Sequence, residues 1–400
     1  MIYDLLDLYD VKSGMGNKSR NDFDPNKYEN HIVMFKEIFN NSKLPDKNKL
    51  STTVNLKQGE LERFDVKFGD VLLTSSSETP NELAMSSVAL RDYPNTVYSG
   101  FSKRLRPITH LTNPQYMRYW FRSRQFRDYI DSTVSMTTRA NLNMAILSAI
   151  KIDLPDLNTQ KAIANILSSL DDKIELNNKI NKNLEELAQT LYKQWFVDFE
   201  FPNGDGEPYK SSGGVMVESE LGLIPKGWEV KELSDVALVS SGKRPPIKVE
   251  EKTKEYKYPV IGASRVMAYT QEYNIDEKIL IIGRVGTHGI VQRITEKVWA
   301  SDNTLTIKSN VYEFVYQILN QIDYKSLNRG STQPLITQTD INKTEILVPK
   351  SDLLEYFEKV VSSLFEVHKH NLIQNNKLSK TRDELLPKLM NGEIEVAIEE

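Results

Sequence analysis

Arginine and lysine side chains gather in one part of the first half of the chain. Residues 101–153 contain nine Lys or Arg against three Asp or Glu, a local excess of +6 in a chain whose net charge is −4. Guanidinium groups present forked donors that match phosphate oxygens and the major-groove edge of guanine. Local charge matters more than total charge for a nucleic-acid surface, so this stretch indicates a DNA-contacting face. The residues preferred for contact are Arg104, Arg106 and Arg139.

A second set of basic and polar residues follows in the second half of the chain. Residues 243–308 contain twelve Lys or Arg against eight Asp or Glu. Within them, residues 283–289 are glycine-rich and follow an expected strand, but they lack the Gly-Lys-Ser/Thr ending of a nucleotide-binding loop. We interpret them as a strand-to-strand turn that lets the backbone approach DNA. The residues preferred for contact in this half are Lys243, Arg244, Arg265, Arg284, Thr287, His288 and Gln333.

Residues 115–132 mix arginine with aromatic side chains at helical spacing. Large aromatic residues are more often buried than stacked on bases, so we expect them in the core. The arginines of this stretch are then expected on the wet face of the helix. The aromatic residues are Tyr119, Trp120, Phe121 and Phe126, and the arginines are Arg118, Arg122 and Arg124.

Metal-dependent hydrolysis is the alternative chemistry. Asp46, followed by Asp65 and Lys67, fits a loose nuclease pattern in which two carboxylates hold Mg²⁺ and a lysine assists. The intervening segment does not resemble the core strand that such a site requires. The sequence also has no Walker loop, no Asn/Asp-Pro-Pro-Tyr/Phe methyl-transfer motif, no cysteine and only five histidines. We therefore expect no catalytic residue and no metal site, with a magnesium-dependent nuclease or a stand-alone scaffold as the alternative.

Two long helices must position these side chains. Residues 158–199 contain no proline or glycine, and a helix of this length needs a partner for its apolar seam. Residues near the C-terminus repeat the pattern, and in both copies the third seam position is Asn. We expect the two asparagines to set the register of the pair, the alternative being that both face solvent. The seam residues are Ile163, Leu170, Asn177, Leu184 and Leu191, then Phe357, Leu364, Asn371, Leu378 and Leu385.

The globular segments that precede these helices are also duplicated. Residues 233–242 match residues 5–14 at an offset of 228, and residues 330–349 match residues 136–155 at an offset of 194. The offset of 194 also carries Ser168-Ser169-Leu170 onto Ser362-Ser363-Leu364. Between these blocks, residues 277–283 match residues 69–75, and residues 298–301 match residues 97–100. One offset that holds through loop, strand and helix indicates an internal duplication of about two hundred residues.

The fold expected from this pattern is α+β. Two tandem globular units would be separated by two long helices that pair antiparallel with pseudo-two-fold symmetry. A helix of about forty residues is roughly 60 Å long, so the pair would form a rod with one unit at each end. The absence of cysteine favours an intracellular setting. No signal peptide and no apolar run of membrane-spanning length is expected.

Several motifs resemble the specificity (S) subunit of Type I restriction–modification enzymes over essentially the full length. The second unit opens with an Ile-Pro-x-Gly-Trp-x-Val motif that is typical of this family. The first unit departs from the pattern, because it lacks this opening and has Ser135-Met136-Thr137-Thr138-Arg139 where the second unit has a Gly-Ser-Thr-Gln sequence. Its first strand is therefore expected to be shortened or differently capped. The typical motifs are Ile224-Pro225-Lys226-Gly227-Trp228-Glu229-Val230, Gln194-Trp195-Phe196-Val197-Asp198-Phe199 and residues 385–396.

The resemblance implies a non-catalytic DNA-recognition subunit with two target recognition domains, each reading half of a split target with an unspecified gap. It also implies that the helices hold the two domains apart and dock two methyltransferase subunits, and through them restriction subunits, in a host-defence complex. Adenine methylation with S-adenosylmethionine, and ATP and magnesium chemistry, would belong to those partners. The domains expected are 1–154 and 201–348 for recognition, the latter with its linker, and 155–200 and 349–400 for the helical regions. The location implied is the bacterial or archaeal cytoplasm.

Overall fold

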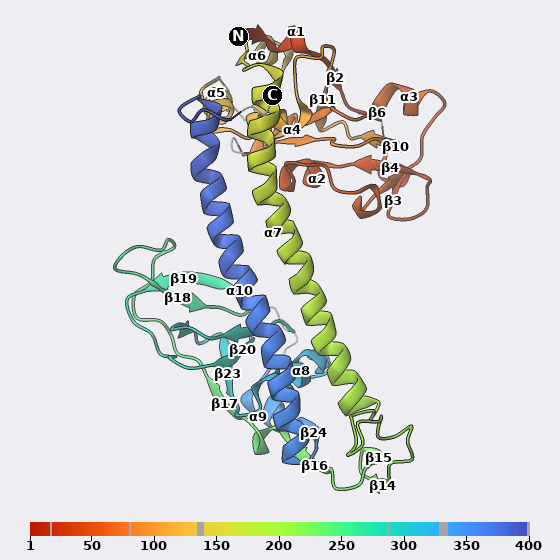
Figure 1. Ribbon diagram of the computed structural model, residues 1–400, viewed down its shortest axis with the longest axis vertical. Helices are drawn as coiled ribbons and strands as arrows, with labels where there is room; N and C mark the ends of the chain where they lie inside the picture. The colour runs from red at the N-terminus through yellow and green to blue at the C-terminus, as the bar shows by residue number, and fades with distance from the viewer. Residues whose placement is uncertain (17, 80–81, 134–139, 286–288, 328–334, 398–400) are drawn as a thin grey trace. The chain divides into compact units, whose positions relative to one another are not determined.

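The computed structural model describes residues 1–16, 18–79, 82–133, 140–285, 289–327 and 335–397 (Figure 1). The chain divides into two compact units. Unit 1 comprises Met1–Leu176 and Ile373–Glu400, and unit 2 comprises Asn177–Leu372. Each unit therefore contains one globular part and one half of each of the two long helices.

The globular part of unit 1 is built on two sheets. The first has the strand order β2 (Tyr9–Ser13), β11 (Ser102–Pro107), β7 (Val71–Thr74) and β9 (Ser86–Val88). The second has the order β3 (Phe23–Asp24), β5 (Thr53–Val54), β4 (Asn30–Val33), β10 (Tyr93–Tyr98) and β6 (Asp65–Val66). Two short pairs complete the strands, β1 (Ile2–Asp4) with β13 (Lys151–Asp153) and β8 (Ser76–Ser77) with β12 (Ala140–Asn141).

Short helices cover these sheets. They are α1 (Leu5–Leu8), α2 (Phe35–Asn40), α3 (Glu60–Phe64), α4 (Pro114–Trp120), α5 (Arg124–Thr133) and α6 (Met144–Ser148). Residues 115–132, predicted as one helical stretch, form two helices because Phe121–Ser123 break the run between α4 and α5. The aromatic prediction for this stretch is confirmed, since four side chains are at most 5% exposed: Tyr119, Trp120, Phe121 and Phe126.

The globular part of unit 2 repeats this design. Its four-stranded sheet has the order β17 (Leu238–Ser241), β23 (Thr304–Lys308), β20 (Ile279–Gly283) and β21 (Val291–Ile294). A three-stranded sheet has the order β19 (Val266–Thr270), β18 (Tyr258–Ile261) and β22 (Trp299–Ala300). The remaining pairs are β14 (Met216–Ser219) with β15 (Gly222–Pro225) and β16 (Glu229–Glu232) with β24 (Glu345–Val348), and the short helices are α8 (Tyr312–Gln321) and α9 (Gln338–Asn342).

The strand registers confirm the internal duplication. Tyr3 pairs with Ile152 in unit 1, and Lys231 pairs with Ile346 in unit 2, which reproduces the offsets of 228 and 194. Helices α6 and α9 are also related by 194, and each has a capped N-terminus: the side chain of Asn143 accepts from the Ile146 amide, and that of Thr337 accepts from the Asp340 amide.

Two of the internal matches need a correction of one residue. The Tyr98 carbonyl accepts from the Met15 amide, and the Ala300 carbonyl accepts from the Lys243 amide. Because residues 15 and 243 are counterparts, residue 98 corresponds to residue 300, not to residue 299. The match of residues 69–75 with 277–283 shifts in the same way, because Thr74 faces Ser102 and Gly283 faces Thr304 across the sheet. Strands β7 and β20 are buried at every position and consecutive residues in them are mostly apolar, so pattern alone does not distinguish a shift of one residue.

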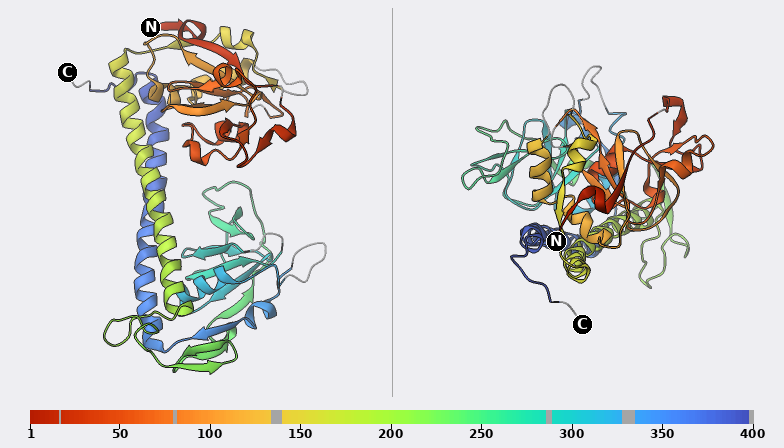
Figure 2. Two further views of the ribbon diagram at one scale, coloured as in Figure 1. Left: turned by 90° about the vertical axis from the view of Figure 1, so that its right-hand side faces the viewer. Right: turned by 90° about the horizontal axis from the view of Figure 1, so that it is seen from above.

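The long helices are α7 (Leu157–Tyr192), followed by a π-helical turn at Lys193–Val197, and α10 (Ser351–Met390). They lie alongside each other within each unit (Figure 2). In unit 2, Asn181 contacts Asn371 and Glu185 contacts His368, so residue numbers rise on one helix as they fall on the other. In unit 1, Asp171 contacts Arg382, and Ile163, nearer the start of α7, lines one cavity with Leu389, nearer the end of α10. The predicted antiparallel pairing is therefore confirmed within each unit. No helix among the described residues is long and apolar enough to cross a membrane.

Candidate nucleic-acid interface

The end of strand β17 in unit 2 presents two exposed cations on a fixed backbone. A Cβ added to Gly242 would lie 2.0 Å from the Ser301 carbonyl oxygen, so only glycine fits this close approach. Beyond it, the Lys243 amide donates to the Ala300 carbonyl at 2.9 Å, and the Trp299 indole Nε1 donates to the Lys243 carbonyl at 2.7 Å. The backbone is thus held by the sheet while the side chains of Lys243 and Arg244 are exposed. A cation presented this way suits phosphate or base-edge contact.

The turn between β18 and β19 presents a third exposed cation. The Gly262 amide donates to the Arg265 carbonyl at 2.8 Å, which closes the turn. The Gly262 carbonyl accepts from Gln292 Nε2 of strand β21 at 2.8 Å, which ties the turn to the neighbouring sheet. Arg265 is exposed, and Val266 and Met267 beside it are 43% and 40% exposed. A guanidinium next to apolar side chains can pair with guanine and contact a thymine methyl group.

These three cations have no ion pair with any carboxylate in the described part of the chain. The contrast is with Lys278, Arg293, Lys297 and Lys308 of the same unit, each of which pairs with an acid. A cavity of about 230 Å³ at the same strand end is lined by Lys243, Lys308 and Glu277 among others. Lys243, Arg244 and Arg265 are therefore unpaired cations in loops beyond the strands, where a ligand can reach them.

The two described candidates of unit 1 are used within the fold. Arg104 is 4% exposed, and its Nη1 donates to Asp65 Oδ1 at 3.0 Å. Arg106 makes a bidentate pair with the buried Asp70, with Nε to Oδ1 at 2.8 Å and Nη2 to Oδ2 at 2.7 Å. Hydrogen bonding to Asp70 raises the pKa of Arg106. Both guanidinium groups already have carboxylate partners, so we do not include Arg104 and Arg106 among the residues that we propose to contact DNA. Sequence reasoning missed these pairings because Asp65 and Asp70 lie more than thirty residues away in the chain.

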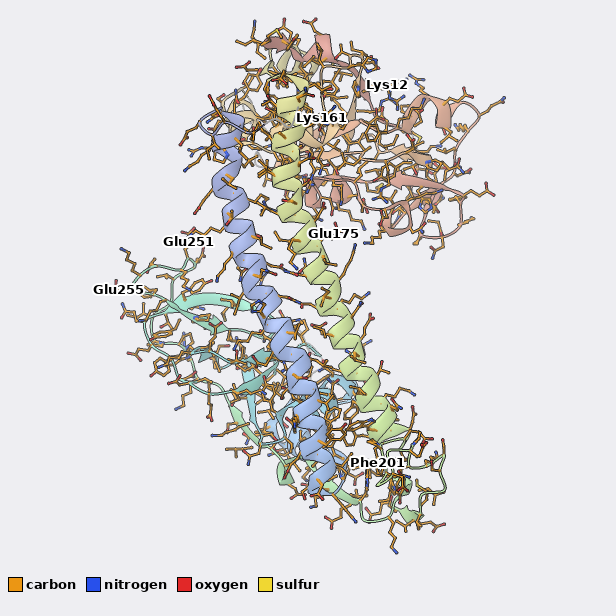
Figure 3. All side chains as sticks on the ribbon, viewed as in Figure 1. Lys12, Lys161, Glu175, Phe201, Glu251 and Glu255 are labelled. Carbon is orange, nitrogen blue, oxygen red and sulfur yellow. The ribbon has the colours of Figure 1, made fainter. Side chains whose placement is uncertain are left out.

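Unit 1 has the same close approach of a glycine to a backbone carbonyl oxygen, but different side chains follow the glycine. A Cβ added to Gly14 would lie 2.0 Å from the Ser99 carbonyl oxygen, as a Cβ on Gly242 would from Ser301. The residue that follows is the buried Met15, where unit 2 has the exposed Lys243. The neighbouring cations of unit 1 are Lys12 (Figure 3) and Lys103, whose Nζ donates to Ser13 Oγ at 2.9 Å. The offset of 228 could have drawn attention to this strand end from sequence.

The other predicted contact residues have different settings. Arg284 is half-buried, and its backbone is held by Asn303 and Ile336. Arg139, Thr287, His288 and Gln333 lie outside the described residues.

Arg118 and Arg122 do not lie on a wet helix face, contrary to expectation. Arg118 is 8% exposed and its Nη2 bonds to Asp171 of α7 at 2.7 Å. Arg122 donates to the carbonyl oxygens of Ile38, Phe39 and Ser86. These arginines satisfy buried acceptors between α4 and its neighbours, and Arg124 alone of the three is exposed. A helical pattern does not show which polar groups will be buried with partners.

Comparison with known proteins decides the family. The family model described as the Type I restriction modification DNA specificity domain matches residues 2–186 and 225–379. The chain belongs to this family. It is a Type I specificity subunit, and a role in DNA recognition follows from the family.

Similar specificity subunits cover most of this one. The Type I restriction enzyme MjaIX specificity subunit of Methanocaldococcus jannaschii is 29% identical over 82% of this chain and 78% of its own length. The Type I restriction enzyme HindI specificity subunit of Haemophilus influenzae is 26% identical over 76% of this chain and 82% of its own. The crystal structure of the S subunit of a Type I restriction-modification system from M. genitalium has a TM-score of 0.59 at 16% identity, covering 97% of this chain and 95% of that one. That likeness shows that the two chains share a fold.

The seam between the long helices of this specificity subunit has two positions in each seven-residue repeat, whereas the sequence pattern predicted one. Of the predicted seam residues, Ile163, Asn177, Phe357 and Asn371 are buried, and the other six are partly buried. A second set lies three or four residues away on the same faces and completes an a/d pattern. It comprises Leu167, Ile174, Asn181, Ala188 and Trp195 on α7 and its π-helical turn, and Leu354, Val361, His368, Asn375, Arg382 and Leu389 on α10.

The asparagines of the seam are buried and do not face solvent. Asn177 is fully buried, Asn181 is 5% exposed, and Asn371 is 8% exposed. Asn371 Nδ2 donates to Asn181 Oδ1 at 2.8 Å. The hydrogen bond that sets the register therefore joins Asn371 to Asn181, which lies one helical turn after the predicted partner Asn177. A buried polar pair of this kind penalises any shift of one helix along the other.

The carboxylates of the alternative nuclease pattern are paired with cations. Asp65 accepts from Arg104 and is bridged by Lys67 at 3.0 Å, while Asp46 pairs with Arg91. Burial favours the neutral form of Asp65, but hydrogen bonds and charges from Lys67 and Arg106 outweigh it and lower the pKa of Asp65. No cluster of three or more potential metal ligands is present among the described residues. The two carboxylates neutralise different basic side chains, and this arrangement does not resemble a shared magnesium site.

Proposed function

We propose that this specificity subunit reads a bipartite DNA target, with each unit contacting one half-site and an unspecified gap between them. The observation that carries the proposal is the repeated four-stranded sheet with the same strand order and the same glycine approach at Gly14 and Gly242. The side chains beyond that approach differ, Met15 in one unit and Lys243 with Arg244 in the other. Two readers of the same architecture with different surface chemistry fit two different half-sites.

In unit 2 the contact surface consists of Lys243, Arg244 and Arg265. Lysine and arginine that approach the backbone supply salt-dependent affinity, and an arginine that reaches a guanine edge supplies sequence preference. Arg139, Arg284, Thr287, His288 and Gln333 remain predictions for the same role. The domain limits we propose are 1–154 and 201–348 for recognition with linker, and 155–200 and 349–400 for the helical regions.

We assign the outer faces of α7 and α10 to docking of two methyltransferase subunits, and restriction subunits through them. Both helices carry apolar side chains outside their shared seam. Each of the following is at least 45% exposed: Leu176, Leu187, Val367, Leu372 and Ile373. We propose that a protein partner covers these apolar side chains. S-adenosylmethionine, ATP and magnesium would then bind to the partners, and the assembly would act on DNA inside the cell.

The experiment is to co-express the chain with its candidate methyltransferase subunit and profile adenine methylation across a genome. The expected result is one split motif whose methylation requires both proteins. Replacing residues 1–154 by the first domain of another specificity subunit should change one half of the motif and leave the other half unchanged. Methylation without this chain, or simultaneous loss of both half-sites, would contradict the proposal.

A further inference from the structure

Each unit carries an exposed side chain at the tip of a turn that leads into its four-stranded sheet. In unit 1 the turn is formed by residues 99–102 and leads into β11, and in unit 2 it is formed by residues 301–304 and leads into β23 (Figure 1). Because residue 98 corresponds to residue 300, the two turns are counterparts and Phe101 corresponds to Asn303. Phe101 is 56% exposed, and Asn303 is also exposed.

The backbone of the two turns is closed in the same way. The Ser99 carbonyl accepts from the Ser102 amide at 3.1 Å and from the Ser102 hydroxyl at 2.6 Å. The Ser301 carbonyl accepts from the Thr304 amide at 3.1 Å and from the Thr304 hydroxyl at 2.7 Å. Each turn therefore has the hydrogen bond of a β-turn between its first and fourth residues, reinforced by a side chain.

The tip residues are also tied to the next strand of the sheet. The Phe101 carbonyl accepts at 2.8 Å from the amide of Ser75, which immediately follows β7. The Asn303 carbonyl accepts at 2.9 Å from the amide of Arg284, which immediately follows β20. The sheet thus fixes the backbone of both tip residues, while their side chains differ in chemistry and reach solvent.

The turn of unit 2 adjoins a residue already proposed to contact DNA. The close approach of Gly242 is to the carbonyl oxygen of Ser301, the first residue of the turn, and the Gly242 amide donates to the Thr304 carbonyl at 3.0 Å. Lys243 follows Gly242 directly, so Lys243 and Asn303 extend from adjoining backbone segments at one strand end.

The turn of unit 1 has the same setting. Gly14 approaches the Ser99 carbonyl oxygen as closely, and the Gly14 amide donates to the Ser102 carbonyl at 2.9 Å. The residue after Gly14 is the buried Met15, so this strand end lacks the cation of unit 2 and offers the Phe101 ring beside it.

The two tip side chains suit different bases. An asparagine amide can donate to N7 of adenine and accept from its N6 amino group, and a phenyl ring can pack on the 5-methyl group of thymine. The Asn303 side chain has no hydrogen-bond partner within the described part of the chain, so its donor and its acceptor are both available. The exposed carboxylate of Asp302 beside it is repelled by phosphate, which favours a base edge as the partner of this turn.

Exposure alone would not distinguish these residues. Lone apolar side chains are common on protein surfaces, and asparagine is favoured in turns because of its backbone preferences. What distinguishes Phe101 and Asn303 is their place. They occupy one backbone position in two duplicated units, next to the glycine that brings the strand end against the turn.

We propose that Phe101 and Asn303 determine DNA sequence preference, Phe101 by contact with a thymine methyl group in one half-site and Asn303 by pairing with an adenine in the other. This inference rests on the proposed function, because it requires each unit to read one half-site.

Position-by-position DNA preference tests Asn303. The full-length chain is co-expressed with its methyltransferase subunit, and the probe is a duplex of the methylated motif in which each half-site position is randomised in turn. Asn303→Asp keeps the size of the side chain and removes the amide donor, so we expect a drop of about tenfold in the preference for adenine at one position. Asn310→Asp, exposed beyond the opposite end of β23, adds the same charge and should change no position.

Removal of a thymine methyl group tests Phe101. Deoxyuridine replaces thymine at one position of the duplex at a time, and the complex with the unchanged chain should bind about fourfold more weakly when the contacted thymine is replaced. Phe101→Ala should remove this dependence on the methyl group. Phe68→Ala should keep it, because Phe68 is 55% exposed on a turn at the opposite end of β7.

The outcomes separate this inference from the proposed function. A split motif together with an unchanged adenine preference in Asn303→Asp, or a uniform loss at every position, overturns the assignment of Asn303. A split motif without a methyl dependence, or with one that persists in Phe101→Ala, overturns the assignment of Phe101. In these cases the proposed function stands, whereas the absence of any split motif with the unchanged chain overturns both.

Discussion

Asn371 and Asn181 form a buried hydrogen bond between α10 and α7, with Nδ2 of Asn371 2.8 Å from Oδ1 of Asn181. Both lie on a seam whose other members are mostly apolar, including Leu184 and Ala188 on α7. A polar pair in such a seam contributes little net stability but costs free energy when broken, because the remaining partner stays desolvated. The pair therefore favours one register of the helices over its neighbours.

Replacing one member of this pair should destabilise the chain more than replacing both. Asn371→Leu leaves the amide of Asn181 buried without this partner and should lower the free energy of unfolding of unit 2 by about 1–3 kcal/mol. The double variant Asn181→Leu/Asn371→Leu should recover most of that loss. Urea denaturation followed by circular dichroism measures both, with the exposed Asn376→Leu as control. A double variant no more stable than Asn371→Leu alone would contradict the expectation.

Asp171 ties three elements of unit 1 together through one carboxylate. Its Oδ2 accepts from Arg118 and from the Tyr119 hydroxyl, both at 2.7 Å, and its Oδ1 accepts from Arg382 at 2.7 Å. Asp171→Asn should cost about 3 kcal/mol of stability, because Arg118 loses its charge partner at a largely buried site and Arg382 keeps only Asp383. The exposed Asp172→Asn should be nearly neutral. Thermal unfolding of the two variants gives the comparison, and equal melting temperatures would contradict this role.

Removing the two exposed cations at the end of β17 should weaken DNA binding in a salt-dependent way. Lys243→Ala/Arg244→Ala should reduce affinity and flatten the slope of log K against log salt by about 1–2, if each contacts a phosphate. Titration of duplex DNA at several salt concentrations measures both quantities. Lys161→Ala on α7 (Figure 3) is the control, since this exposed lysine lies on a helix outside the proposed surface. An unchanged salt slope would exclude these two residues as phosphate contacts.

Arg265→Ala should act on sequence preference as well as on affinity. Loss of a bidentate pair with guanine costs about 1–3 kcal/mol and relaxes discrimination at one base pair. Methylation profiling with the variant subunit would show a degenerate base at one position of the second half-site. A uniform loss across all targets would instead assign Arg265 to the phosphate backbone.

The ion cluster around Glu313 should make unit 2 sensitive to acid. Glu313 is fully buried and pairs with Arg293, and with Lys278 at 2.9 Å. Burial favours the neutral acid, but hydrogen bonds and charges from Arg293 and Lys278 outweigh it and lower the pKa of Glu313. An acid with a lowered folded-state pKa contributes stability above its unfolded pKa of about 4.3 and loses that contribution as pH falls further.

The test is the difference in unfolding free energy between the chain and Glu313→Gln, followed from about pH 7 to about pH 3. The difference should be about 3 kcal/mol at pH 7. It should shrink below about pH 4.3, because Glu313 of the unfolded chain takes up a proton there while the folded carboxylate, whose pKa is lowered, stays charged to lower pH. Burial, with a smaller contribution from the charge of Glu313, raises the pKa of the neighbouring Glu358. The subtraction removes the part due to burial, and Glu313→Gln itself removes the part due to the Glu313 charge. The exposed Glu366→Gln is the control, and a pH-independent difference would contradict the assignment.

Heptad spacing predicted half of the helix seam, and the repeat offsets predicted the duplication that the strand pairs β1–β13 and β16–β24 reproduce. Both are local or repetitive properties that can be read from residue spacing alone. The second half of the seam was harder to find because it includes His368, Asn375 and Arg382, which apolar patterns do not pick out. A shift of one residue in the β22 match escaped detection because neighbouring apolar residues are interchangeable in such a comparison.

By itself, the sequence determined that the chain is a duplicated α+β protein with two long paired helices, and its motifs placed it in its family. Periodicity and internal repetition depend only on the spacing of residues along the chain, so they can be recognised without a structure. Only the tertiary structure decided which cations are free. Arg106 and Lys243 are both basic residues that the sequence predicts to contact DNA. In the structure Arg106 is paired with the buried Asp70, while Lys243 is exposed at a strand end. The reason is that charge pairing depends on distance in space between residues far apart in the chain, and burial makes that pairing obligatory.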